Sequence, residues 1–252
     1  MNTPSSLPQD ALKALQHQLG NEQVLTEETE RWSYGYDNSR RQALPDAVVF
    51  PQNHEDVLTI VKICNDYQIP LIARGRGTGT TGATVPLTGG LVLSTERMDK
   101  IISIEPVNRY MVVEPGVLNQ TVQDQAAQHG YFWPPDPTSA AYCTIGGNLA
   151  YNSAGPRAVK YGTPRENVFG LRAVTGKAET IRTGVYTSKG VVGYDLTRLL
   201  IGSEGTLAII TEATLKLTPL AESKRTIQAI YKNIESAAEA VSTIMARPLT
   251  PC

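Results

Sequence analysis

The sequence is short of cysteine, of net charge and of long apolar runs. Its three cysteines, Cys64, Cys143 and Cys252, are odd in number and show no CxxC spacing, which argues against a metal knuckle or a disulfide framework and fits a reducing compartment. Lysine and arginine total 23 against 24 acidic residues, a net charge of −1 that gives no reason to expect nucleic acid as a partner. No apolar run approaches the ~20 residues of a membrane span, and the N-terminal residues lack a secretion signal. We expect a cytoplasmic protein without a transmembrane segment, with peripheral contact to the inner membrane left open.

The 252 residues alternate between helical and strand-like patterns, which predicts an α+β protein. Helices are predicted over 7–19, 53–67, 118–129, 193–205 and 235–246. Strands are predicted over 46–52, 69–73, 90–95, 101–106, 110–116, 170–175, 179–183, 206–219 and 225–231. Asn53 is expected to cap the second helix, with Asp56 three residues on. The strand at 206–219 is expected to turn alternate residues from Leu207 to Leu217 toward one face. The three histidines, His17, His54 and His129, are interpreted as surface or capping residues.

The stretch "ARGRGTGTTG" (73–82) contains a G-x-G-x-x-G pattern. A Rossmann dinucleotide site needs a helix directly after such glycines. Here Pro86 and the pair Gly89-Gly90 occupy the first turns, where they cost a helix ~3 and ~1 kcal/mol per residue. A Walker loop is excluded because no Lys-Ser/Thr pair follows. Two interpretations remain, a plain tight turn and a nest of backbone amides that holds a phosphate. The density of glycine, threonine and arginine favours the phosphate.

Three further motifs lie downstream: "PPDPTSAAYCTIGGNLAYNSAGP" (134–156), "KYGTPRENVFGLRAV" (160–174) and "GYDLTRLLIGSEGTLAIITEATLKL" (193–217). With the glycine loop they resemble the FAD-linked oxidases of the vanillyl-alcohol oxidase superfamily, over about residues 31 to 219. Within it the motifs are most similar to the branch of the glycolate oxidase FAD subunit and the D-lactate dehydrogenases.

This resemblance implies a PCMH-type FAD-binding domain over 1–220, made of two α/β subdomains (1–105 and 106–220), with 221–252 beginning a substrate or cap domain. The loop would wrap the FAD pyrophosphate, the Pro-Asp and "IGGN" segments would line the flavin, and "GSEGTLAIIT" would lie near the adenine and isoalloxazine. The implied cofactor-binding residues are Arg74, Gly75, Arg76, Gly77, Thr78, Gly79, Thr80, Thr81, Pro135, Asp136, Thr138, Thr144, Gly146, Gly147, Asn148, Ser153, Ala154, Gly155, Glu204, Gly205 and Ile210. No metal site is implied. The loop has no histidine that would link a flavin, so non-covalent FAD is expected.

The resemblance also implies a reaction, the oxidation of a 2-hydroxy acid such as glycolate or D-lactate to the 2-oxo acid, with hydride transfer to flavin N5. The residues reveal no catalytic base and no electron acceptor. We expect the chain to end inside the cap domain and to turn over little on its own. The alternative is a non-catalytic FAD-binding subunit or stub that requires a partner chain. A nucleotide-sugar reductase of the same fold is a third hypothesis, which "KYG" and "GYDLTRLL" disfavour.

Overall fold

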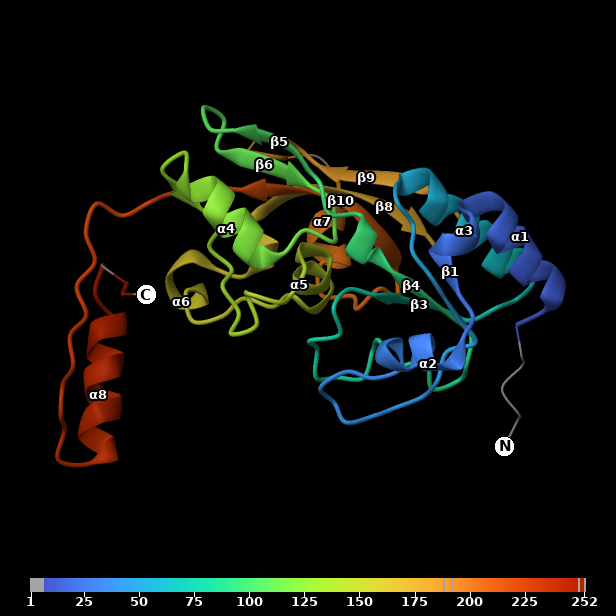
Figure 1. Cartoon of the computed structure of the whole chain (residues 1–252). Helices are drawn as coiled ribbons and strands as arrows, with labels where there is room; N and C mark the ends of the chain where they lie inside the picture. The colour runs from blue at the N-terminus through green and yellow to red at the C-terminus, as the bar shows by residue number, and fades with distance from the viewer. Residues whose placement is uncertain (1–6, 188, 192, 249, 252) are drawn as a thin grey trace.

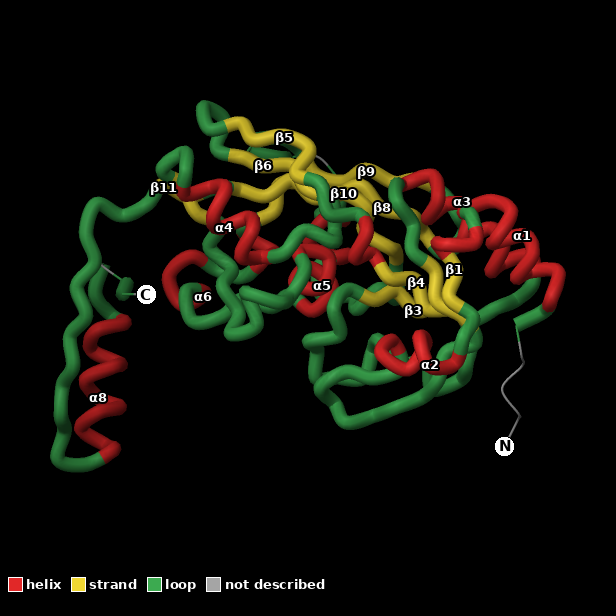
Figure 2. Tube along the Cα trace, in the orientation of Figure 1, coloured by secondary structure: helices red, strands yellow, loops and turns green. Residues whose placement is uncertain are grey.

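Two sheets with helices on their faces make up the body of the protein (Figures 1 and 2). The computed structural model describes residues 7–187, 189–191, 193–248 and 250–251. Within these residues, no helix has both the length and the apolar character needed to cross a membrane.

The first sheet has four strands in the order β1-β2-β4-β3, of which β2, β4 and β3 are parallel and β1 is antiparallel at the edge. Its strands are β1 (Val24–Leu25), β2 (Ala47–Val49), β3 (Leu71–Arg74) and β4 (Leu91–Ser94). Helices α1 (Gln9–Leu19) and α3 (His54–Asp66) cover one face, where Leu15 and Ile60 pack with Leu93. Helix α2 (Glu28–Arg31) and the turn after it lie toward the other face, where the Tyr34 ring meets Phe50 edge-on.

The start of α3 confirms the predicted cap. The Asn53 side chain accepts a hydrogen bond from the Asp56 backbone amide at 3.0 Å, which satisfies one of the free donors at the helix N-terminus. No helix follows the glycine loop, as Pro86, Gly89 and Gly90 predict; the chain runs through turns and bends to β4. A Rossmann arrangement is therefore excluded.

The second sheet has five antiparallel strands in the order β5-β6-β10-β8-β9. Its strands are β5 (Ile101–Glu105), β6 (Tyr110–Val113), β8 (Val168–Thr175), β9 (Thr180–Gly184) and β10 (Ala208–Lys216). One face carries the helices α4 (Asn119–Ala127), α5 (Ile145–Tyr151) and α7 (Leu196–Leu200). Toward the other face, Val174 and Ile209 join the core that α3 forms on the first sheet. The two sheets therefore share a core.

The connections complete the body. A short pair of strands, β7 (Tyr131–Phe132) and β11 (Thr218–Pro219), and a helix, α6 (Ala158–Tyr161), lie beyond α5. The chain passes from the first sheet to the second between β4 and β5, shortly before the predicted subdomain boundary at residue 105. The division into domains stays a prediction.

The predicted face of the strand at 206–219 is wrong in its first half. Residues Ala213, Leu215 and Leu217 do share one core, but before them it is Ala208 and Ile210 that face this core, not Leu207 and Ile209. The register between β10 and β8 shifts between Ile210 and Glu212. A β-bulge adds one residue to one strand, so it moves the alternation by one position. The bulge therefore places Ile210, and not Ile209, on the same face as Ala213.

Two other predictions fail. Residues 225–231 form no strand, because a strand needs a hydrogen-bonded neighbour and none lies beside this segment in the described chain. The segment leads instead to helix α8 (Ile234–Met245), which stands apart from the body with Ile234 and Val241 exposed (Figure 1). His54 is neither a surface nor a capping residue; it is buried, for reasons given below.

Candidate functional site

A cavity that opens to solvent is lined by residues from both sheets. Three segments supply most of its walls: the glycine loop and its flanks (residues 73–79, 83 and 84), the α5 region (residues 144, 146–148, 150, 151 and 153), and the turn with the start of β10 (residues 203–205 and 208–210). The segments are distant in sequence, so the cavity exists only once both sheets have formed.

The glycine loop is held from beneath by Arg74. Its side chain is buried, and its guanidinium donates to the carbonyls of Tyr36 at 2.8 Å and Ser33 at 3.1 Å. Burial lowers the pKa of Arg74, and the nearby Asp37 carboxylate opposes this shift. A side chain on Gly77, whose φ is +67°, would overlap the Arg74 guanidinium at 2.2 Å. The cation therefore lies directly behind the loop, with its hydrogen bonds directed at the protein.

Asp37 is a second support for the loop. The carboxylate is buried and accepts from the backbone amides of Gly82 at 3.0 Å and Ser39 at 2.8 Å. Next to it, Asn38 donates its backbone amide to the Gly79 carbonyl at 2.9 Å. Since buried polar groups need such partners, these bonds set the path of the loop and leave glycine backbone on the cavity side.

Helix α5 forms the opposite wall and approaches the loop closely. Thr144 caps the helix by accepting from the Gly147 amide at 3.3 Å. A Cβ on Gly75 would lie 2.4 Å from the Thr144 hydroxyl, and one on Gly146 would lie 2.6 Å from Pro115 Cβ. Glycine is therefore required on both walls for steric reasons. Behind it, the Asn148 side-chain nitrogen is buried and has no hydrogen-bond partner within the described chain.

The turn from Gly202 to Gly205 forms the third side. Glu204 has a φ of +53°, and its amide donates to the Ala150 carbonyl at 2.9 Å. A non-glycine residue in this region costs of order 1–3 kcal/mol and persists only where its surroundings hold it. The Thr81 hydroxyl lies 3.2 Å from the Tyr151 phenol oxygen and 3.3 Å from a Glu204 carboxylate oxygen. These contacts connect the loop to both other walls.

Charges around the cavity are few. The Arg76 side chain is half exposed and lies 3.9 Å from Glu96. Glu96 also accepts from the Tyr34 phenol at 2.7 Å, and burial followed by this bond raises the pKa of Tyr34 to about 12. Burial likewise raises the pKa of Tyr151. Both phenols stay protonated near neutral pH. No group of three or more metal-ligating side chains lies within the described residues.

The structure brings most of the predicted site residues to this cavity. Those that line it are Arg74, Gly75, Arg76, Gly77, Thr78, Gly79, Thr144, Gly146, Gly147, Asn148, Ser153, Glu204, Gly205 and Ile210. Those outside the lining are Thr80, Thr81, Pro135, Asp136, Thr138, Ala154 and Gly155. The assignment of all of them to a cofactor stays a prediction.

The Pro-Asp segment packs against the chain that follows α5. Asp136 pairs with Arg157 at 3.1 Å, and its amide donates to the Ala154 carbonyl at 2.8 Å. A Cβ on Gly155 would overlap the Asp136 carbonyl. These close backbone contacts are enough to explain why Ala154 and Gly155 are small, so no ligand is needed to account for them.

Sequence reasoning missed several lining or supporting residues. Tyr151 and Ser139 lie inside the quoted motif, but neither type marks a site by itself. Asp37 follows "GY" in a turn-like stretch, where Asp, Asn and Ser are common. No local signal separates such a carboxylate from an ordinary turn residue.

Comparison with known proteins identifies similar domains. Residues 45–184 match the family model described as the FAD binding domain. The chain is 45% identical over 222 residues to the glycolate oxidase subunit GlcD of Bacillus subtilis, covering 88% of this chain and 47% of that protein. It is 37% identical over 210 residues to a D-lactate dehydrogenase of Anaerostipes hadrus, covering 83% and 44%. The chain thus spans about half the length of the curated relatives it matches.

Solved structures share the fold. An alkyldihydroxyacetonephosphate synthase superposes with a TM-score of 0.77 at 24% identity, over 88% of this chain and 46% of that one. A p-cresol methylhydroxylase with substrate bound superposes with a TM-score of 0.71 at 25% identity, over 85% and 44%. These likenesses confirm the predicted fold.

Proposed function

The chain belongs to the FAD binding domain family, and from that premise we propose that it is the FAD-binding half of an oxidoreductase that converts a 2-hydroxy acid, such as glycolate or D-lactate, to the 2-oxo acid. The observation that carries the substrate class is the 45% identity to a glycolate oxidase subunit, together with matches to D-lactate dehydrogenases. Those names describe the relatives, and they motivate the proposal for this chain.

Two features of the cavity fit FAD. The glycines at 75, 77 and 79 line the cavity at positions where side chains would collide with Thr144, Arg74 and Tyr151. The buried Asn148 amide has a free donor at the lining. A buried donor without a partner costs about 1–3 kcal/mol, so a ligand acceptor there would stabilise the complex.

We assign the roles of the residues on this basis. The glycine loop would hold the anionic pyrophosphate through its amides, with the Thr78 hydroxyl and Arg76 adding donors. The Arg74 cation behind the loop would add favourable charge without contacting the ligand. Asn148 would donate to the ring system from the α5 wall. Apolar residues of the third side, among them Ala208 and Ile210, would exclude water.

FAD, when bound, supplies the acceptor for the hydride removed from the substrate carbon. The described lining holds no histidine, and Glu204 is its one carboxylate. We therefore assign no catalytic base within the described residues. The group that takes the hydroxyl proton is proposed to come from a further part of the protein or from a partner.

The test is a chimera in which this chain replaces the segment of the Bacillus subtilis subunit that it matches. We expect the chimera to bind FAD and to reduce an artificial dye with glycolate or D-lactate. The matched control carries Gly75→Ala, which should weaken FAD binding and reduce dye reduction with it. A folded, FAD-loaded chimera that no 2-hydroxy acid reduces, while dithionite does, would overturn the catalytic proposal.

The alternative is a non-catalytic FAD-binding subunit. It is favoured by the word "subunit" in the name of the Bacillus subtilis relative and by the absence of a base from the described lining. Anaerobic mixing of the FAD-loaded chain with glycolate or D-lactate separates the two. Under the alternative the flavin stays oxidised until a partner chain is added.

A further inference from the structure

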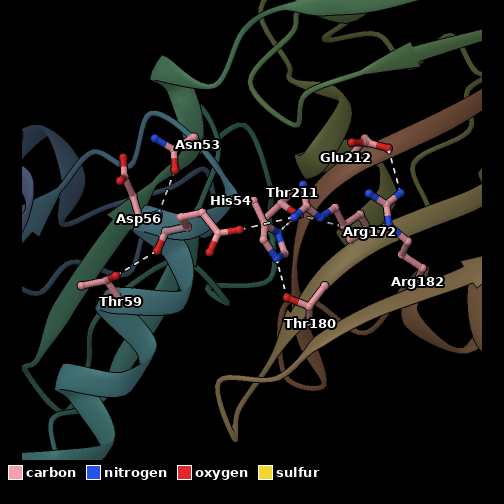
Figure 3. Close-up of polar contacts among 10 residues, drawn as sticks. Asn53, His54, Asp56, Thr59, Arg172, Thr180, Arg182, Thr211 and Glu212 are labelled. Carbon is pink, nitrogen blue, oxygen red and sulfur yellow. Dashed lines mark hydrogen bonds and ion pairs between the residues drawn. The ribbon is translucent and has the colours of Figure 1, made fainter.

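His54 lies between α3 and the second sheet and is not part of the cavity lining (Figure 3). It is the first residue of α3, and 6% of its surface is exposed. Its Nδ1 lies 2.7 Å from the Thr211 hydroxyl on β10, and its Nε2 lies 2.7 Å from the Thr180 hydroxyl on β9. The ring therefore connects a helix of the first sheet to two strands of the second.

The hydrogen bonds around the ring select one neutral tautomer. The Thr211 hydroxyl donates to the Arg172 carbonyl at 3.1 Å, so its single proton is already used. Its oxygen must accept from His54, which places the proton on Nδ1. Nε2 is then an acceptor, and the Thr180 hydroxyl donates to it. A second proton on Nε2 would remove this acceptor.

The charges that face His54 disfavour such a second proton. Arg172 on β8 pairs with Glu55 on α3 at 3.5 Å, and Arg182 on β9 pairs with Glu212 on β10 at 3.6 Å (Figure 3). The ring also lies at the N-terminus of a 13-residue helix, the positive end of its dipole. Burial lowers the pKa of His54, the Arg172 guanidinium lowers it further, Glu55 opposes this, and Arg182 adds a smaller lowering.

The ring is joined to both walls of the cavity through short paths. Thr211 lies at the β-bulge of β10, directly after Ile209 and Ile210, and both of these line the cavity. At its other end, α3 leads through one turn to β3, which runs into the glycine loop. The position of α3 against β10 therefore influences the distance between the two walls.

We propose that neutral His54 is a positioning residue that holds the two walls of the FAD cavity together, and that its protonation loosens the cofactor. The inference rests on FAD as the ligand of this cavity and adds a regulatory element to it. Protonation would turn Nε2 into a donor, so the Thr180 hydroxyl would have to rotate and accept, and it would place a third positive charge beside Arg172 and Arg182.

The sign of the pH effect follows from the lowered pKa. The unfolded chain binds a proton at His54 below its ordinary pKa of about 6.5, whereas the folded chain resists it. The stabilisation is fully present above that pH and is lost as the pH falls through the lowered pKa of the folded form. FAD binds the arrangement in which neutral His54 holds the two walls together, so the dissociation constant of FAD should rise as the pH falls.

The experiment is a fluorescence titration of the FAD-free chain with FAD from about pH 8 to about pH 5. For the wild type we expect the dissociation constant to rise as the pH falls through the lowered pKa of His54, by at most about tenfold per pH unit for one linked proton. His54→Gln, which stays neutral, should bind FAD more weakly at pH 8 but lose this rise. The exposed histidines provide matched controls, His17→Gln and His129→Gln, which should follow the wild type.

Two variants with exposed charged groups test the inference without altering the ring. Glu55→Gln removes the group that raises the pKa of His54, so the transition should move to lower pH; Arg182→Gln should move it to higher pH. If His54→Gln does not fold, these two variants test the inference in its place. The inference about His54 would be overturned, with the cofactor site left standing, by either of two results. One is a wild type that binds FAD equally across the pH range, and the other is a His54→Gln variant with the wild-type pH profile. A folded wild type that binds no FAD at pH 8 would overturn the cofactor site and the inference with it.

Discussion

The substitution Gly75→Ala tests the approach of the two walls at its narrowest point. Gly75 lies on the glycine loop, and an added Cβ would lie 2.4 Å from the Thr144 hydroxyl and 3.8 Å from Gly147 Cα. The hydroxyl cannot move freely, because it caps α5 by accepting from the Gly147 amide. The methyl group must therefore displace the cap or push the loop away from the helix.

The cost can be worked out from these two options. Loss of an N-cap bond costs about 1 kcal/mol, and overpacking a tight site costs about 1–3 kcal/mol. Together they amount to roughly 2–4 kcal/mol. If the walls separate to relieve the overlap, this cost falls on FAD binding, and the dissociation constant rises roughly 30- to 700-fold.

The assay is a titration of the FAD-free chain with FAD, followed by flavin fluorescence. Gly176→Ala is the matched control, since a Cβ there meets nothing within 4 Å and the site lies in the turn between β8 and β9. The control should bind FAD as the wild type does. A folded Gly75→Ala chain that binds FAD within about threefold of the wild type would refute the reasoning, because threefold corresponds to less than about 1 kcal/mol.

The other predictions concern supports of the site and the mode of attachment. Arg74→Met leaves two buried carbonyls without their donor and removes the positive charge near Asp37, which should cost about 3–5 kcal/mol and lower the thermal midpoint by roughly 6–20 °C in a melting experiment. Wild-type melting would contradict it. Tyr151→Phe removes the phenol beside Thr81, a loss of about 0.5–1.5 kcal/mol that should weaken FAD binding roughly 2- to 10-fold in the same titration. Acid precipitation should release free flavin, and colour retained in the pellet would refute non-covalent attachment.

Features that depend on nearby residues could be predicted from the sequence. The Asn53 cap needs only Asp56 three residues away, and the absence of a helix after the glycine loop follows from Pro86 and Gly89. Most of the residues predicted for the cofactor site line the cavity, because the motifs that carry them lie within continuous segments; their role stays a prediction. The motifs predicted the lining residues correctly where one continuous segment supplies a whole wall of the cavity.

Features that depend on the contact between the two sheets could not be predicted. The bulge at Thr211 exists only in register with β8, so no alternation pattern in β10 reveals it. His54 looks like a helix-end residue until α3 packs against β9 and β10. In the same way, Arg74 looks like a phosphate ligand until its guanidinium meets the Ser33 and Tyr36 carbonyls. Each of these cases is decided by partners more than thirty residues away.

The central claim is that the cavity between the glycine loop and α5 binds FAD. Titration of the purified, folded chain with FAD tests it most directly, with bound and free flavin separated by equilibrium dialysis. The account predicts saturable binding of one FAD per chain, which Gly75→Ala weakens and Gly176→Ala leaves unchanged. The account would be contradicted if the folded chain bound no FAD when the cofactor was present in excess. It would also be contradicted if Gly75→Ala and Gly176→Ala bound FAD equally well.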